Sequence, residues 1–207
     1  MPLALESAPL HDVSVYLWNI EETQDELLSL CSNAGIDTSV VASYRSQQRV
    51  REKLATLLLL HHIFGKGFCL EYSSVGAPRI AHTCSHISIS HSAHVVGVAV
   101  SHHHPIGLDI EHKADQVVRV REKFLNASEL SSVNPDDKIE NLRFWTAKEA
   151  VYKAIEADGI DFRHHIYKST LDSFSFIAIK DNANHLFAVH SFMHDTQFMV
   201  TIATPME

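Results

Sequence analysis

The sequence lacks any apolar run of about 18 residues or more, the length that a transmembrane helix requires. It also lacks a basic N-terminal region followed by an apolar stretch, so we expect no secretory signal. Only three cysteines occur, and the scatter of Cys31, Cys69 and Cys84 fits reduced thiols better than a disulfide framework. The formal net charge of -8 argues against nucleic acid as a partner. These absences predict a cytoplasmic protein with no membrane or nucleic-acid partner.

The composition is otherwise typical of a globular protein. The chain has 207 residues, of which 45% are hydrophobic and 20% charged, so it can bury a core in one large or two small packed domains. The spacing of the apolar residues then indicates where helices and strands form. Strands are expected at 13–20, 69–73, 86–90, 95–101, 106–111, 173–180, 185–193 and 196–204, and helices at 21–34, 38–64, 115–125 and 137–157.

This order of elements predicts an α+β fold. Each half of the chain has helices followed by a three-stranded antiparallel pattern, which is compatible with an ancient duplication. We therefore expect two similar α+β halves, residues 1–103 and 104–207, each with a small antiparallel sheet packed on a long helix. Two halves within one chain make a monomer the expected state.

Two carboxylates occupy a short apolar strand. Asp109 and Glu111 are two residues apart, so the period-two geometry of a strand puts both on one face. Two close carboxylates repel each other unless a cation lies between them. Hard oxygen ligands of this kind suit Mg2+, which usually takes one or two protein carboxylates and completes its shell with phosphates and water. The pattern therefore predicts a Mg2+ site.

The stretch from Phe144 to Lys153 indicates a helix, because it contains good helix formers and neither glycine nor proline. Glu149 and Lys153 lie four residues apart, on one face of that helix. An isolated pair of this kind is most often an exposed salt bridge. The spacing of this stretch alone therefore leaves a structural and a functional interpretation open.

Three motifs follow one another along the chain: Ser88-Ile89-Ser90-His91-Ser92, then Gly107-Leu108-Asp109-Ile110-Glu111, then Trp145-Thr146-Ala147-Lys148-Glu149-Ala150-Val151-Tyr152-Lys153. Together they resemble the 4'-phosphopantetheinyl transferase superfamily, of the pseudo-dimeric Sfp-like type, over roughly residues 43–180. The resemblance implies a Mg2+-dependent transfer of the 4'-phosphopantetheine group of coenzyme A to a serine of an apo acyl or peptidyl carrier protein, releasing 3',5'-ADP. It also implies that a pseudo-two-fold axis relates the halves.

The resemblance assigns roles to individual residues. Asp109, Glu111 and Glu149 would hold Mg2+. Glu149 and Lys153 would be the catalytic residues, as general base and as a group that stabilises the leaving phosphate. The residues implied to bind coenzyme A are Arg51, Arg79, Ser90, His91, Lys148 and Lys153.

Two of these assignments have alternatives. Arg51 is the best match to the basic residue that the family places against the 3'-phosphate, and Arg45 and Arg49 are weaker candidates on the same helix. The family commonly has Gly-Lys-Pro in a turn where this chain has Ala77 in place of the lysine. Arg79 could supply the missing charge from the same loop.

The resemblance also suggests that the helix at 115–125 helps to bind the carrier protein. Phe124 or Leu125, if exposed, would provide an apolar anchor. The basic side chains that would meet acidic carrier helices are Arg119, Arg121 and Lys123. The alternative is an ordinary helix with Phe124 in the core.

Sixteen histidines are present, and one group of histidine and cysteine residues has a spacing compatible with a zinc site. His82, Cys84 and His86 alternate, so on a strand they would share a face, but a fourth ligand is missing and exposed loop residues are the plainer interpretation.

Two further functions stay open. One is a catalytically inactive relative that binds coenzyme A or a carrier, and the other is a histidine-rich metal-binding protein.

Overall fold

The computed structural model describes residues 3–10, 12–171 and 174–206. Its N-terminal half contains β1 (Leu3–Leu10), β2 (Val13–Asn19), α1 (Gln24–Ala34), the 3-10 helix η1 (Ser39–Ser43), α2 (Gln47–Phe64), β3 (Leu70–Tyr72), β4 (Pro78–Ile80), β5 (His86–Ser92) and β6 (Val95–Ser101). Its C-terminal half contains β7 (Gly107–Glu111), α3 (Ala114–Arg119), the 3-10 helix η2 (Arg121–Lys123), α4 (Ala127–Ser132), α5 (Lys138–Ile155), β8 (Ile166–Lys168), β9 (Ser175–Lys180), β10 (Ala183–His194) and β11 (Phe198–Pro205). Within the described part of the chain, none of the helices has the length and apolar character needed to cross a membrane.

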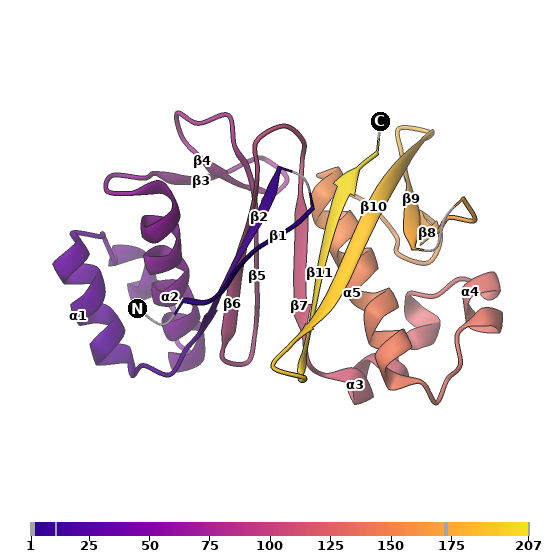
Figure 1. The fold of residues 1–207 in the computed structure, drawn as a ribbon, viewed down its shortest axis with the longest axis horizontal. Coiled ribbons are helices and arrows are strands. Elements are labelled where there is room, and N and C mark those ends of the chain that lie inside the picture. Colours follow the sequence, from indigo (N-terminus) through magenta and orange to yellow (C-terminus); the bar gives the residue numbers. More distant parts are fainter. Residues whose placement is uncertain (1–2, 11, 172–173, 207) are drawn as a thin grey trace.

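The strands form two antiparallel sheets, one in each half. The first has the order β1-β2-β6-β5-β4-β3 and the second the order β7-β11-β10-β9-β8. Each sheet carries one 18-residue helix on its outer face, α2 on the first and α5 on the second, as Figure 1 shows. The predicted α+β fold of two similar halves is therefore confirmed.

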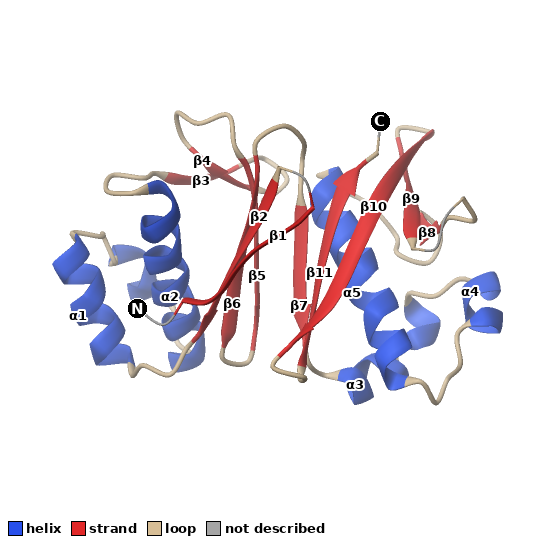
Figure 2. Ribbon diagram, viewed as in Figure 1, coloured by secondary structure: helices blue, strands red, loops and turns tan. Residues whose placement is uncertain are grey.

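The two sheets pack face to face, so the molecule is layered as helices, sheet, sheet and helices (Figure 2). Val15, Leu17 and Ala99 of the first sheet share one core with Leu108 and Ile202 of the second. A second core lies beneath α1 and α2, and a third lies around α5. Because β6 is covered on both faces, every residue of that strand is buried, which explains its nearly continuous apolar sequence.

Serine side chains of β5 join the two halves. Ser88 and Ser90 lie on one face of β5, and their hydroxyls accept hydrogen bonds from the backbone N–H groups of Leu108 (2.9 Å) and Ile110 (3.1 Å). β7 is the edge strand of its sheet, so these N–H groups would otherwise lack strand partners. The seryl hydroxyls therefore fix β7, and with it the two predicted carboxylate ligands, against the N-terminal half.

Some predicted element boundaries differ from the structure. The helix expected at 38–64 is interrupted, because η1 ends at Ser43 and α2 begins after Ser46, whose side chain caps the N–H of Arg49. The helix expected at 115–125 is α3 followed by the single turn η2. Strand β1 was not predicted, and a turn was predicted where β4 forms. Residue 173 of the strand expected at 173–180 lies outside the described residues.

Gly107 should be intolerant of a side chain, because β7 lies directly on the backbone of α5 at this point. A Cβ atom at Gly107 would be 1.7 Å from the carbonyl oxygen of Ala150, so Gly107→Ala should lower the free energy of unfolding by roughly 3 kcal/mol or more. Gly97→Ala is the matched control, since its Cβ would meet side-chain carbons of Ile110 and Leu17, which can move. Urea unfolding measures both variants, and equal losses would contradict this account of the helix–strand contact.

Candidate functional site

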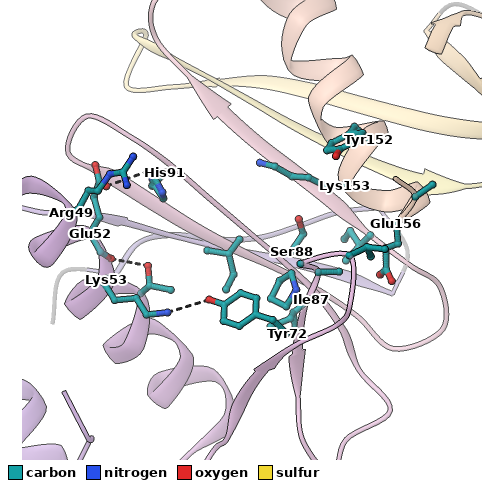
Figure 3. Close-up of a pocket in the computed structure, with 18 of the residues that line it drawn as sticks. Arg49, Glu52, Lys53, Tyr72, Ile87, Ser88, His91, Tyr152, Lys153 and Glu156 are labelled. Atoms are coloured by element: carbon teal, nitrogen blue, oxygen red, sulfur yellow. Dashed lines mark hydrogen bonds and ion pairs between the residues drawn. The ribbon is translucent and has the colours of Figure 1, made fainter. Parts of the chain in front are cut away.

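A pocket of about 470 Å3 opens between α2, the β3–β4 hairpin, β5 and the C-terminal end of α5, and Figure 3 shows the side chains around it. Its volume lies in the range of small-molecule sites. Residues of both halves contribute to its wall. The charged side chains and the histidine that line it are Arg49, Glu52, Lys53, His91, Lys153 and Glu156.

Two cations on α2 face this pocket. Arg49 and Lys53 are four residues apart, and therefore one turn apart on the same face of the helix. The ammonium of Lys53 donates to the hydroxyl of Tyr72 (3.1 Å) and lies 5.5 Å from the centre of its ring (Figure 3). Sequence reasoning ranked Arg49 low and did not single out Lys53. The available signal was their position on the helix: both follow the Ser46 cap and lie one turn apart on the same face of α2.

His91 contacts α2 beside the same pocket. Its Nδ1 atom lies 3.3 Å from Oε2 of Glu52. Glu52 is buried, and its other oxygen accepts a hydrogen bond from Nε2 of Gln48 (2.8 Å). A carboxylate at Nδ1 orients an imidazole ring and leaves its Nε2 edge for a ligand. His91 is thus brought to the pocket, and its contact with coenzyme A stays a prediction.

Lys153 is the centre of a hydrogen-bond network that crosses between the halves. Its ammonium donates to the carbonyl of Leu108 (2.7 Å), to Oδ1 of Asp109 (2.9 Å) and to Oγ of Ser90 (3.2 Å). The hydroxyl of Ser90 also accepts from the N–H of Ile110 and donates to Oδ1 of Asp109 (3.2 Å). Ser90 is buried, and its hydroxyl is engaged inside the protein. It therefore orders Lys153 and Asp109, while Lys153 itself reaches the pocket.

The three predicted metal ligands lie close enough for their charges to interact. The pKa of Glu149 is raised to about 7, first by burial and then by the negative charge of Asp109; Glu111 adds to this shift and Lys153 opposes it. Glu111 in turn accepts a hydrogen bond from the hydroxyl of Ser92 (2.9 Å). One carboxylate of α5 and two of β7 are therefore within range of each other's charge.

These carboxylates are not arranged as a complete set of metal ligands. Among the described residues, no group of three or more His, Cys, Asp and Glu side chains is arranged to hold a metal ion. Asp109 is paired with Lys153, and Glu111 accepts from two backbone N–H groups. The donor set nevertheless fits Mg2+, because all three groups are hard oxygen ligands and a cation would relieve the repulsion that raises the pKa of Glu149.

The predicted contact of Lys148 with coenzyme A is wrong. The side chain is fully buried and its ammonium donates to Oε2 of Glu129 (2.6 Å). Burial lowers the pKa of Lys148, and the charge of Glu129 opposes that effect. Three backbone carbonyls also accept hydrogen bonds from the ammonium, those of Phe124, Phe162 and Ile166. Adjacent helix residues point about 100° apart, so Lys148 enters the core while Glu149 faces β7.

Two predicted arginine ligands are not part of the pocket lining. The guanidinium of Arg51 donates to the backbone carbonyls of Glu22 (3.0 Å) and Ile20 (3.2 Å), so it ties α2 to the end of β2. The guanidinium of Arg79 is paired with Glu156. The structure therefore does not bring Arg51 to the position expected of a phosphate ligand.

The zinc interpretation is also wrong. Residues 81–82 form a turn and residues 83–85 an irregular loop rather than a strand, and β5 begins only at His86. His82 has a positive φ of 61°. The alternation of His82, Cys84 and His86 in the sequence therefore does not produce a shared strand face.

The predicted apolar anchor for a carrier protein is wrong as well. Phe124 and Leu125 are 1% and 0% exposed and belong to the core around α5. The guanidinium of Arg121 donates to Oδ1 of Asn141 and to the carbonyl of Val133, so Arg121 also has a structural role. Arg119 and Lys123 are exposed.

Comparison with known families finds a match in the C-terminal half of the chain. Residues 105–203, which include β7 and α5, match the family model of the 4'-phosphopantetheinyl transferase superfamily. The matched segment contains all three carboxylates and Lys153. A search among curated proteins gives no match for the chain.

Lys148 should matter for stability. Lys148→Met leaves the carboxylate of Glu129 buried without its partner and should cost roughly 3–5 kcal/mol of unfolding free energy. The double variant Lys148→Met/Glu129→Gln should lose less than the sum of the single changes, because neither charge is then left buried alone. Urea unfolding measures these losses, with Lys53→Met as a control at a less buried lysine. Additive losses would show that the buried pair is not coupled.

Glu149 should make the metal-free protein less stable as the pH rises. Its pKa is about 7 in the folded protein and near 4.5 in an unfolded chain, so between these values the folded state binds more protons. We therefore compare the unfolding free energy of Glu149→Gln with that of the wild type. The difference in favour of the variant should be smallest below about pH 4.5 and should grow by up to roughly 3 kcal/mol by about pH 8. Unfolding in EDTA across this range tests it, with the exposed Glu122→Gln as control. A constant difference across the range would contradict the raised pKa.

Proposed function

Because residues 105–203 match the family model of the 4'-phosphopantetheinyl transferase superfamily, we propose that this protein transfers the 4'-phosphopantetheine group of coenzyme A to a serine of an apo acyl or peptidyl carrier protein and releases 3',5'-ADP. One observation carries the proposal. Lys153 of α5 and Asp109 of β7 meet Ser90 of β5 beside a pocket lined by cations. Little covalent chemistry is needed for such a transfer, so positioning and charge carry most of the catalysis.

The pocket cations would hold the phosphates of coenzyme A. Arg49, Lys53 and His91 line one side, and Lys153 approaches from the other half. Charged donors of this kind bind phosphate oxygens strongly. Lys153 is already oriented by the carbonyl of Leu108 and by Asp109, so it would need little rearrangement to stabilise the charge that grows on the departing 3',5'-ADP.

The reaction also requires removal of one proton. The serine oxygen of the carrier attacks the β-phosphorus, the bond from that phosphorus to the oxygen bridging to 3',5'-ADP breaks, and the hydroxyl proton must reach a base. Glu149, with a pKa of about 7, is well matched to accept that proton near neutral pH.

Asp109, Glu111 and Glu149 would hold Mg2+, which when bound supplies positive charge to the pyrophosphate. Glu149 would take one of its two roles at a time, because a carboxylate that binds a cation is a poor base.

A catalytically inactive relative that binds coenzyme A or a carrier is the second candidate. Ala77 lines the pocket where the family commonly has lysine, which favours this reading. The exposed Arg119 and Lys123 on α3 and η2 would serve a carrier partner in either case, because acidic carrier helices would meet their positive charge. Only a measurement of transfer separates the two candidates.

Mass spectrometry of an apo carrier protein incubated with the enzyme, coenzyme A and Mg2+ tests the proposal. The wild type should add one phosphopantetheine group, and transfer should stop when EDTA removes the metal. Asp109→Ala and Lys153→Ala should each lower the rate by about 100-fold or more. The first removes a proposed Mg2+ ligand and a partner of Lys153, and the second removes positive charge next to the reacting phosphates. Lys66→Ala changes an exposed lysine outside the pocket and should leave the rate unchanged.

A wild type that binds coenzyme A without modifying any of several carriers would favour the inactive relative. Near-normal turnover by Asp109→Ala would remove that residue from the site. An unchanged rate in Lys153→Ala would do the same for Lys153.

A further inference from the structure

An ion pair links the two halves at the edge of the pocket. The guanidinium of Arg79 on β4 donates to Oε2 of Glu156, the residue that follows α5. The two residues are 77 positions apart in the sequence, and their side chains are 37% and 19% exposed. His86 lies opposite Arg79 on β5, and its pKa is lowered by burial and by the charge of Arg79. The ion pair is therefore partly shielded from water at the contact between the two halves.

Each end of this ion pair is attached to a different wall of the pocket. Ala77 and Pro78, directly before Arg79, line the pocket from the β3–β4 hairpin. Glu156 lines it from the C-terminal end of α5, three residues after Lys153, and both residues belong to the lining. The pair therefore joins the hairpin wall to the segment that presents Lys153.

The backbone at Glu156 has a conformation that favours glycine. Its φ of 48° and ψ of 56° are left-handed, a conformation that glycine adopts freely and that costs other residues roughly 1 kcal/mol or more. Lys180 donates to the carbonyl of Ile155 (3.2 Å), so the helix end also has a cap that does not depend on Glu156. A strained residue beside a pocket is a reason to look for a function of its side chain.

We propose that Arg79 and Glu156 form a strut that holds the hairpin wall of the pocket at a fixed distance from Lys153, so that both are positioning residues for the transfer. The proposal rests on the proposed function. Arg79 then acts on coenzyme A through Glu156 and the hairpin, without touching the nucleotide itself. This role differs from the one that the sequence suggested, in which Arg79 replaces the missing lysine of the turn.

Removing either charge should have the same effect if the strut exists. Arg79→Gln and Glu156→Gln should each lower kcat/KM for coenzyme A by roughly tenfold, since small displacements of positioned groups are costly. The double variant should be no worse than either single one, because the pair is already broken. If Arg79 bound the nucleotide directly, Arg79→Gln would weaken binding of coenzyme A while Glu156→Gln would strengthen it or leave it unchanged. In a titration with coenzyme A, a loss of affinity in Arg79→Gln without a loss of affinity in Glu156→Gln would therefore overturn the proposal.

Glu156→Gly separates positioning from stability. Glycine relieves the left-handed backbone and removes the carboxylate, so the melting temperature should stay the same or rise. The loss in kcat/KM should still be about that of Glu156→Gln. A Glu156→Gly variant with full activity would show that the carboxylate positions nothing.

Amide hydrogen exchange tests the strut without any transfer reaction. Exchange in the hairpin at residues 74–78 should become faster in both Arg79→Gln and Glu156→Gln, because one anchor of that wall is lost. Unchanged exchange would overturn the strut even if the enzyme is active. A wild type that transfers nothing, but whose hairpin exchange responds to both variants, would instead refute the proposed function and keep the link between the walls.

Discussion

The contact between the serine-bearing strand β5 and the edge strand β7 is the constraint on which the rest of the molecule depends. The hydroxyls of Ser88 and Ser90 accept hydrogen bonds from N–H groups of β7 that would otherwise have no strand partner. The hydroxyl of Ser90 also forms hydrogen bonds with Asp109 and Lys153. The same hydroxyls that join the halves therefore orient the charged side chains of the site. A site at this seam can exist only when both halves are folded and docked.

The distribution of charge resolves an apparent conflict in the sequence. A protein with a net charge of -8 repels anions on average, yet the proposed substrates are anionic. The pocket gathers Arg49, Lys53 and Lys153 at one place, and local potentials within clefts decide where a charged ligand binds. These three cations outnumber the two carboxylates of the lining, Glu52 and Glu156, and Glu156 is paired with Arg79.

The sequence predicted those features that depend on local spacing. Period-two alternation placed Asp109 and Glu111 together, and the i,i+4 spacing of Glu149 and Lys153 placed both on one face of a helix. Orientation toward the core could not be predicted in the same way. Lys148 lies beside Glu149 in the sequence, but its partner Glu129 is 19 residues away on another helix. Arg51 likewise differs from Arg49 only by which side of α2 meets the end of β2.

Helix α5 combines two opposite electrostatic situations. On its inner side, the ammonium of Lys148 meets Glu129 and three carbonyls, a fully bonded buried network that locks the rotation of the helix. On its other side, Glu149 is buried and held near Asp109, so burial first and the repulsion from Asp109 second raise its pKa. A free helix would turn to separate these carboxylates. The buried lysine opposes that rotation, and Gly107, in close contact with Ala150, prevents the strand from moving away. The raised pKa at the site therefore depends on packing at positions that never face the pocket.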